Sequence, residues 1–279
     1  SLQKPIVTRW NSLYNAVQKI YAIKDKLKQE DIKTIMLPIK PFKNRHFVYI
    51  EEYLLWCKPL ATAIDILQGD EYCHYGYLLL SLLLIRKSCK KLLEGQNIPT
   101  SKPIVEILIN DLERSIRDVL NIDNKGEFVA IAAFTHPRFK TNWMSALSNT
   151  VQLKVKDLIK KLIIEKEPST SITQKKSDDY FDFDNDSSFL ETNFIPQGEK
   201  ENELLRFFQQ ESTELKILQD FKEVKKVFLK YNTALPSSAP VERLFSFATL
   251  QNLPKFNRIS DSQFEKQVLY KVNATKKYL

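Results

Sequence analysis

Glycine is scarce in this sequence, with only 5 Gly among 279 residues. Tight β-hairpins, phosphate-binding loops and dinucleotide-binding turns all depend on glycine, because it adopts backbone conformations that other residues resist. Its scarcity argues against all three. Apolar residues instead recur three and four positions apart, which is the spacing of amphipathic helices. The expected fold class is mainly α.

The sequence also lacks a long hydrophobic run and a signal peptide. The longest apolar run, Tyr77 to Ile85, is far shorter than the roughly 20 residues that span a bilayer. We therefore expect no membrane partner. The chain opens on Ser1 and reaches a helical pattern by Trp10, so we expect it to be a segment of a longer protein.

Cysteine is sparse and unpatterned. Cys57, Cys73 and Cys89 are odd in number, lie among apolar helical residues and form no Cys-x-x-Cys pair. A zinc site built from Cys73 and His74 is an alternative, but neighbouring side chains on a helix point about 100° apart. Buried thiols in a reducing compartment are the favoured interpretation, and the chain alone is expected to need no cofactor.

Positive charge is in excess, with 42 Lys and Arg against 34 Asp and Glu and a formal charge of +8. A basic surface attracts nucleic acid and other polyanions. Many basic proteins bind neither, so composition alone leaves this open. No motif for a small-molecule substrate is apparent.

Helical spacing divides the chain into two parts and a linker. Residues 1–167 contain helices from Trp10 onward, residues 168–198 form an acidic linker rich in Ser, Thr and Asp, and helices return in residues 199–279. The stretch 47–67 contains Pro59, so it is either one kinked helix or two joined helices.

Further boundaries follow from capping residues and prolines. Ser101 and Pro103 predict the start of a helix that runs to about Val119. Continuous helical spacing extends from 202 to 231. Pro236 and Pro240 then bracket a turn before two final helices at 241–250 and 261–278, the last of which Ser260 should cap.

The carboxy-terminal region carries the most specific resemblance. Residues 228–246 read FLKYNTALPSSAPVERLFS, and Asn257, Arg258, Ser260 and Asp261 follow. This stretch is similar to the dimerisation region of hAT-family DNA transposases, in which a small-residue turn precedes a Glu-Arg-x-Phe-Ser helix. The resemblance implies a homodimer or higher oligomer.

The same residues form short apolar helices that must bury a face against something. From composition alone, that partner is either the core of the same chain or a second copy; the resemblance favours a second copy. Glu242 and Arg243 are candidates for ion pairs that orient the packing. The expected interface consists of Pro240, Val241, Glu242, Arg243, Leu244, Phe245, Phe247, Arg258, Phe264 and Leu269.

A second resemblance lies in residues 8–12, TRWNS, which are similar to the tryptophan motif at the start of the family's helical insertion domain. In that family the tryptophan lies near the transposon end, where an aromatic face can stack on a base and a cation can hold phosphate. The resemblance implies DNA contacts from Arg9 and Trp10. The alternative is that Trp10 anchors the first helix in the core.

A third resemblance places a catalytic acid. Residues 203–207, ELLRF, look like the family segment that carries the last acid of an Asp-Asp-Glu site. That site holds Mg²⁺ or Mn²⁺ between three carboxylates, so Glu203 is the implied catalytic and metal-binding residue. The two aspartates belong to strands of an RNase H-like fold that this chain does not contain. We therefore expect the chain alone to be inactive.

Residues 132–143, AAFTHPRFKTNW, resemble a family loop in which an acid stands at the position of His136. Arg138 and Lys140 are candidate phosphate contacts, although a solvated loop is the simpler interpretation.

The sequence thus supports two hypotheses. In the first, the chain is the carboxy-terminal portion of a hAT-like transposase that supplies dimerisation and DNA contacts for cut-and-paste transposition in the nucleus. In the second, it is a domesticated, non-enzymatic nuclear adaptor that retains dimerisation, DNA binding or both. Departures from the family pattern at His136, Ala248 and Phe256 favour the adaptor.

Overall fold

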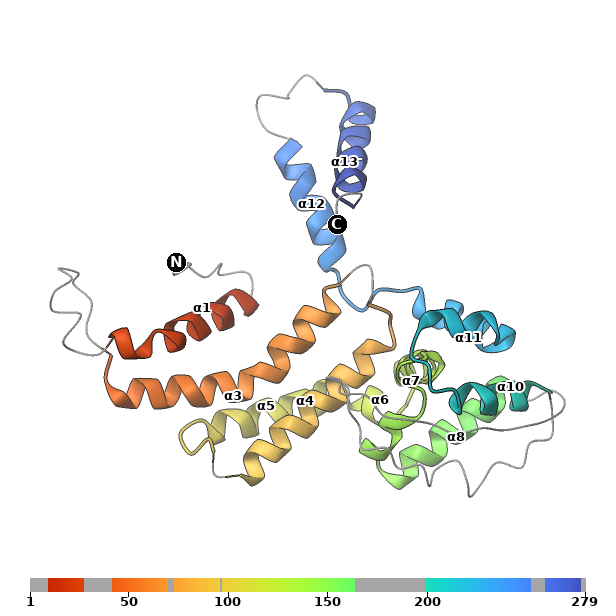
Figure 1. The fold of residues 1–279 in the computed structure, drawn as a ribbon, viewed down its shortest axis with the longest axis horizontal. Coiled ribbons are helices and arrows are strands. Elements are labelled where there is room, and N and C mark those ends of the chain that lie inside the picture. The colour runs from red at the N-terminus through yellow and green to blue at the C-terminus, as the bar shows by residue number, and fades with distance from the viewer. Residues whose placement is uncertain are drawn as a thin grey trace.

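The computed structural model describes residues 10–27, 42–69, 73–95, 97–163, 199–251 and 259–276. Within these ranges the chain forms eleven α-helices and three short 3-10 helices, with no strand (Figure 1). The mainly α prediction is confirmed. The predicted acidic linker, residues 168–198, lies outside the described ranges.

The helices follow the predicted apolar spacing closely. The amino-terminal part contains α1 (Trp10–Ala22), η1 (Lys24–Leu27), α3 (Asn44–Leu67), α4 (Tyr77–Glu94), α5 (Lys102–Ser115), α6 (Arg117–Leu120), α7 (Lys125–Thr135), η2 (Asn142–Ala146) and α8 (Asn149–Ile163). The carboxy-terminal part contains α10 (Glu199–Phe208), η3 (Leu215–Gln219), α11 (Lys222–Asn232), α12 (Ala239–Gln251) and α13 (Asp261–Lys276).

Pro59 lies inside α3, which is one helix and not two. A proline removes one backbone hydrogen bond and its ring crowds the preceding turn, so it bends a helix or breaks it. Figure 1 shows α3 changing direction along its length. The helix continues because its apolar positions on both sides of Pro59 pack against neighbours, among them Cys57 and Ala61.

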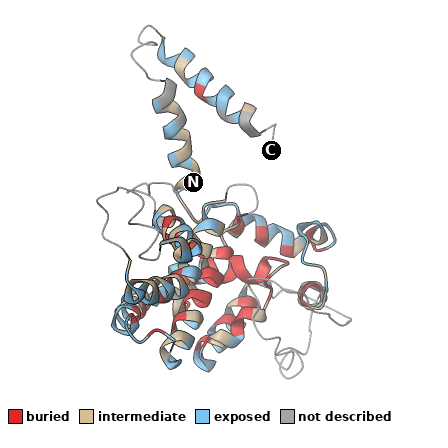
Figure 2. Cartoon of the chain, turned by 60° about the vertical axis from the view of Figure 1, so that its left-hand side comes forward, coloured by how far each residue is buried: buried red, intermediate tan, exposed pale blue. Residues whose placement is uncertain are grey.

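The largest hydrophobic cluster centres on α7. Eight of its residues are buried, including the run from Val129 to Thr135, so the helix is apolar on all sides, as expected of an element surrounded by others. Gly126 opens the helix where a Cβ atom would lie 2.3 Å from the Asp118 carbonyl oxygen, a close approach that only glycine permits. Figure 2 shows the buried residues gathered in the body of the molecule.

The segments before and after the predicted linker share one hydrophobic cluster. Leu204, Phe207, Val224 and Phe228, from α10 and α11, belong to the same cluster as residues of α4, α7 and α8. The predicted boundary between residues 1–167 and 199–279 therefore does not separate two cores.

Asn232, at the end of α11, ties three elements together. It is buried, its side-chain nitrogen donates to the Ala132 carbonyl oxygen at 2.9 Å, and its side-chain oxygen accepts from the Gly76 amide at 3.0 Å. The contact joins the end of α11 to α7 and to the start of α4.

Three local predictions were wrong. The expected continuous helix over 202–231 is interrupted between α10 and α11, where residues 209–221 contain only the 3-10 turn η3. The helix expected from Ser101 to Val119 divides into α5 and α6 at Ile116. The Ser101 hydroxyl makes no capping bond to α5, whereas Ser260 caps α13 through a bond from the Gln263 amide at 3.4 Å.

Candidate functional site

The two last helices form a hairpin that projects from the body (Figure 1). The hairpin begins as the sequence predicts, after the bend between Pro236 and Pro240. The Ser237 hydroxyl accepts from the Ala239 amide at 3.1 Å, and the Ser238 hydroxyl donates to the Glu242 carboxylate at 2.8 Å. These bonds order the first turn of α12.

The two helices of the hairpin pack against each other, yet none of their described side chains belongs to the three hydrophobic clusters of the body. Val268 is the buried residue of the hairpin's described side chains, and Phe264 is half-buried. Most of the hairpin is coloured as exposed or intermediate in Figure 2. A hairpin of this kind has an inner seam but no core of its own.

Large apolar side chains remain exposed on the hairpin. The exposed fractions are 51% for Val241, 65% for Phe245, 49% for Leu269 and 78% for Tyr270. Isolated exposed apolar residues are normal on a monomer, but a concentration of them on one projecting element is typical of an interaction surface. We call these four residues the hairpin patch.

The expected dimer residues divide into three groups. Val241, Glu242, Phe245 and Leu269 are exposed, whereas Pro240, Arg243, Leu244 and Phe264 are half-buried. Phe247 lies on α12, with its side chain outside the described part of the chain, and Arg258 lies outside it altogether. Tyr270 was not predicted, although its position directly after Leu269 was a usable signal.

The base of the hairpin rests on the body. Arg243 donates from Nη2 to the Gln68 carbonyl oxygen at 2.8 Å, at the end of α3. A cavity of about 990 Å³ lies here between α1, the end of α3 and the start of α12. Glu242 accepts from the Ser238 hydroxyl, and the predicted role of Glu242 and Arg243 as orienting ion pairs stays a prediction.

The Glu203 carboxylate is hydrogen-bonded to the start of α11. One of its carboxylate oxygens accepts from the Glu223 amide at 2.7 Å and from the Val224 amide at 3.1 Å, the first-turn amides of α11. A carboxylate at this position satisfies donors that lack partners within the helix and complements the positive end of the helix dipole. Glu203 therefore acts as a cap that joins α10 to α11.

No group of three or more His, Cys, Asp or Glu side chains with the arrangement of a metal site occurs among the described residues. The Glu203 oxygen that accepts two amides faces the start of α11. Because the other two acids of the family's Mg²⁺ or Mn²⁺ site were expected outside the chain, the metal-binding role of Glu203 stays a prediction.

The segment 135–140 is buried except for the half-buried Arg138, so the solvated-loop interpretation is wrong. His136 is 3% exposed and Lys140 is 6% exposed. Burial, with smaller contributions from His74 and Arg138, lowers the pKa of His136 to about 3, which keeps the ring neutral.

Lys140 and Arg138 both bond within the chain. The Lys140 ammonium donates to the carbonyl oxygens of Gln210 and Ser212, beyond the end of α10, and burial lowers its pKa to about 8. The half-buried Arg138 donates from Nη1 to the Tyr77 hydroxyl at 3.2 Å. In this conformation Lys140 is enclosed, and a phosphate contact by it stays a prediction that the geometry does not favour.

The amino-terminal DNA contacts are only partly described. Arg9 lies outside the described residues, and Trp10 is the first residue of α1, with its side chain undescribed. Their role stays a prediction. α1 itself packs on α3, with the Asn11 amide donating to the Ala61 carbonyl oxygen at 3.0 Å.

Comparison with known proteins adds no assignment: no protein-family model matches the sequence, and no curated protein matches it significantly. Across the described residues, every helix is too short or too polar to cross a membrane. The class that the fold defines is therefore a helical body with a projecting, partly apolar two-helix hairpin.

Proposed function

We propose that this chain is the carboxy-terminal portion of a hAT-like transposase, in which the hairpin α12–α13 joins two copies and the basic body contacts DNA during cut-and-paste transposition. The observation that carries the proposal is the exposed apolar patch on a hairpin with the residue pattern of the family's dimerisation region. The partner in this proposal is a second copy of the same hairpin.

The physical argument for self-association starts from the cost of the hairpin patch. Burying a large apolar side chain stabilises a protein by roughly 1.5–3 kcal/mol relative to leaving it in water. Phe245 and Tyr270 are the most exposed of the four residues in the patch. In a two-fold symmetric dimer the same residues of both copies are buried. Each residue of the patch therefore contributes twice to the free energy of association.

A non-enzymatic adaptor is the second candidate, and the environment of Glu203 favours it. Its carboxylate stabilises α11 through two backbone amides, which accounts for an acid at this position without catalysis. An adaptor that acts through dimerisation uses the hairpin in the same role, and both candidates place the protein in the nucleus.

Sedimentation equilibrium tests the shared role directly. With increasing concentration into the micromolar range, the weight-average mass of the wild-type chain should rise from 32.6 kDa toward twice that value. Phe245→Asp places a charge in the patch and should keep the chain monomeric, because an unpaired charge is costly to bury.

The matched control is Phe128→Asp, which changes an aromatic residue of the body with a similar exposure of 57%. It should dimerise as the wild type does. Tyr270→Ser provides a milder change that leaves the inner seam of the hairpin intact, and it should weaken association at least tenfold. A wild-type chain that stays monomeric at high micromolar concentration contradicts the proposal.

A further inference from the structure

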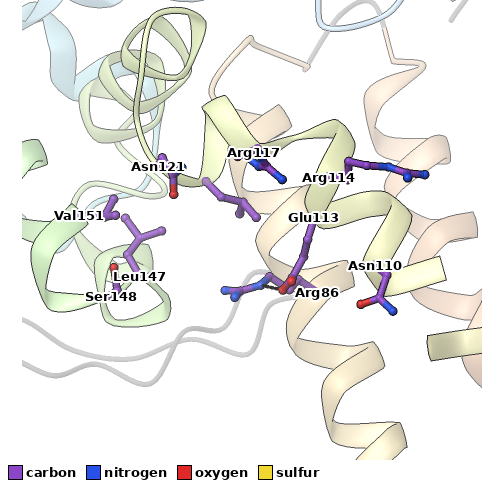
Figure 3. A pocket seen from close by; sticks show the side chains of 10 residues that line it. Arg86, Asn110, Glu113, Arg114, Arg117, Asn121, Leu147, Ser148 and Val151 are labelled. Carbon is purple, nitrogen blue, oxygen red and sulfur yellow. Dashed lines mark hydrogen bonds and ion pairs between the residues drawn. The ribbon is translucent and has the colours of Figure 1, made fainter. Parts of the chain in front are cut away.

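A polar groove of about 450 Å³ opens on the body, and none of its lining residues belongs to the hairpin (Figure 3). Its walls come from α4, α5, α6 and the start of α8, so side chains from four separate helices meet there. Its charged lining contains three arginines and one glutamate: Arg86, Arg114, Arg117 and Glu113.

The single acid in the groove is already neutralised. One carboxylate oxygen of Glu113, Oε1, forms ion pairs with two cations. It lies 2.5 Å from Arg86 Nε and 2.8 Å from Lys90 Nζ. Hydrogen bonds from Lys90 and Arg86 lower the pKa of Glu113. Arg86 is thereby held in place, while the described part of the chain offers no partner to its terminal nitrogens.

The other two arginines add charge that the groove does not offset. Arg117 is exposed, and its side chain forms no hydrogen bond or ion pair with the described residues. Arg114 pairs with Asp111 at 2.5 Å, but both side chains are more than half exposed, and such surface pairs contribute only about 0–1 kcal/mol. The groove therefore carries a net positive charge that is free to meet an anion.

We propose that this groove binds the phosphate backbone of nucleic acid. The inference rests on the DNA contact of the proposed function and assigns it to particular residues. A guanidinium group presents parallel N–H donors that match two oxygens of a phosphate, which lysine does not. Arg86 on α4, fixed by Glu113, and Arg117 on α6 give the groove two such donors in its wall.

The start of α8 lies at the same groove. Ser148 and Val151 line it, and Ser148 stands immediately before the first residue of this 15-residue helix. The amide groups in a first helical turn favour anions. This position adds to the attraction that the arginines provide.

A polyanion suits the site better than a small acid. The groove is open to solvent at the surface, and the chain as a whole carries a formal charge of +8. A small acid would gain little from charges beyond the groove, whereas a nucleic-acid strand extends past the groove and is attracted by the net positive charge of the whole chain.

Fluorescence anisotropy of a labelled 20-base-pair duplex, over a series of salt concentrations, tests the assignment. Removal of one phosphate contact lowers the slope of log affinity against log salt by about 1. Arg117→Ala should therefore reduce the slope by about 1 and the affinity in 0.1 M salt by roughly eightfold. The matched control is Arg45→Ala, an exposed arginine at the start of α3 that does not line the groove.

The outcomes separate this inference from the proposed function. If wild type binds the duplex in a salt-dependent manner and Arg117→Ala binds equally well, the groove is excluded while the DNA contact stands. Equal losses in the two variants indicate net charge alone and also exclude the groove. No duplex binding by wild type overturns both. Selective loss of binding to phosphatidylserine vesicles, with duplex binding retained, overturns the nucleic-acid assignment.

Discussion

At the scale of single residues, buried polar side chains decide how helices meet. Glu52, on α3, is 3% exposed, and its carboxylate accepts from the Thr100 amide at 3.2 Å and the Ser101 amide at 2.6 Å. These amides stand at the start of α5. Glu52 thus supplies the cap that the sequence assigned to Ser101, from a helix about fifty positions earlier in the chain.

Glu52→Ala should lower the free energy of unfolding by about 1–3 kcal/mol, because it leaves two amides at a buried helix start without an acceptor. Urea unfolding measured by circular dichroism checks this. The neighbouring, exposed Glu51 offers the control, and Glu51→Ala should change stability by no more than about 0.5 kcal/mol. Equal effects in the two variants would show that the buried contact has no special role.

The same carboxylate predicts a pH dependence. Burial alone raises the pKa of Glu52, but hydrogen bonds from Ser101 and Thr100 outweigh it, so the net pKa lies below the ordinary value. The folded state then favours the ionised form, which contributes stability above the unfolded pKa and loses it as pH falls through the folded one. Wild type should therefore lose more stability than Glu52→Gln between about pH 5 and pH 3.

At the scale of elements, α10 and α11 are joined by a cap and not by a continuous helix. The apolar spacing of residues 202–231 continues across the break because both helices face the same core. Periodicity reports which residues are buried but does not locate an interruption. The cap from Glu203 to α11 is a long-range contact that no local pattern displays.

Glu203→Ala should lower the free energy of unfolding by about 1 kcal/mol, as other lost helix caps do. Thermal unfolding with and without the change measures this effect. The nearby exposed residue Glu211 provides the control, since Glu211→Ala should be neutral. Unchanged stability in Glu203→Ala would remove the capping role and return Glu203 to the catalytic hypothesis.

At the scale of the whole molecule, each hydrophobic cluster of the body contains one of the three cysteines. Cys73 lies in the cluster around α7, Cys89 in the cluster of α3, α4 and α5, and Cys57 in the small cluster of α1 and α3. All three are buried free thiols. Burial raises the pKa of Cys57 to about 12 and those of Cys73 and Cys89 to about 11.

Thiol labelling at pH 8 should therefore be slow for all three cysteines in the native chain, because the thiolate is the reactive form. With added urea, Cys57 should react first, since its cluster is the smallest and joins only α1 to α3. Single Cys→Ala variants identify which thiol reacts. Simultaneous reaction of all three would show that the clusters open as one unit.

The raised cysteine pKa values also set a direction for alkaline stability. The folded state favours the protonated thiols, so their contribution is fully present below the unfolded pKa near 8.5 and is lost as pH rises through about 11. A variant with all three cysteines changed to alanine should lose less stability than wild type between pH 8.5 and pH 11. An identical alkaline loss in both would assign it to other groups.

The sequence by itself determined the class of fold and most helix boundaries. Glycine scarcity and helical spacing are local properties, and they predicted the mainly α class and the bend at Pro236 and Pro240, but not the breaks between α5 and α6 or between α10 and α11. Local spacing also identified the apolar residues of the last two helices, but not whether they face the body.

Tertiary structure decided the contacts between distant segments. The caps from Glu52 and Glu203, the enclosure of Lys140, and the shared groove of Arg86 and Arg117 all bring together residues that are far apart in the sequence. A side chain's neighbour across such a distance leaves no local signal. The exposure of the hairpin is also a property of the tertiary structure. The hydrophobic clusters of the body are formed without described side chains of the hairpin, so Phe245 and Tyr270 stay exposed to water.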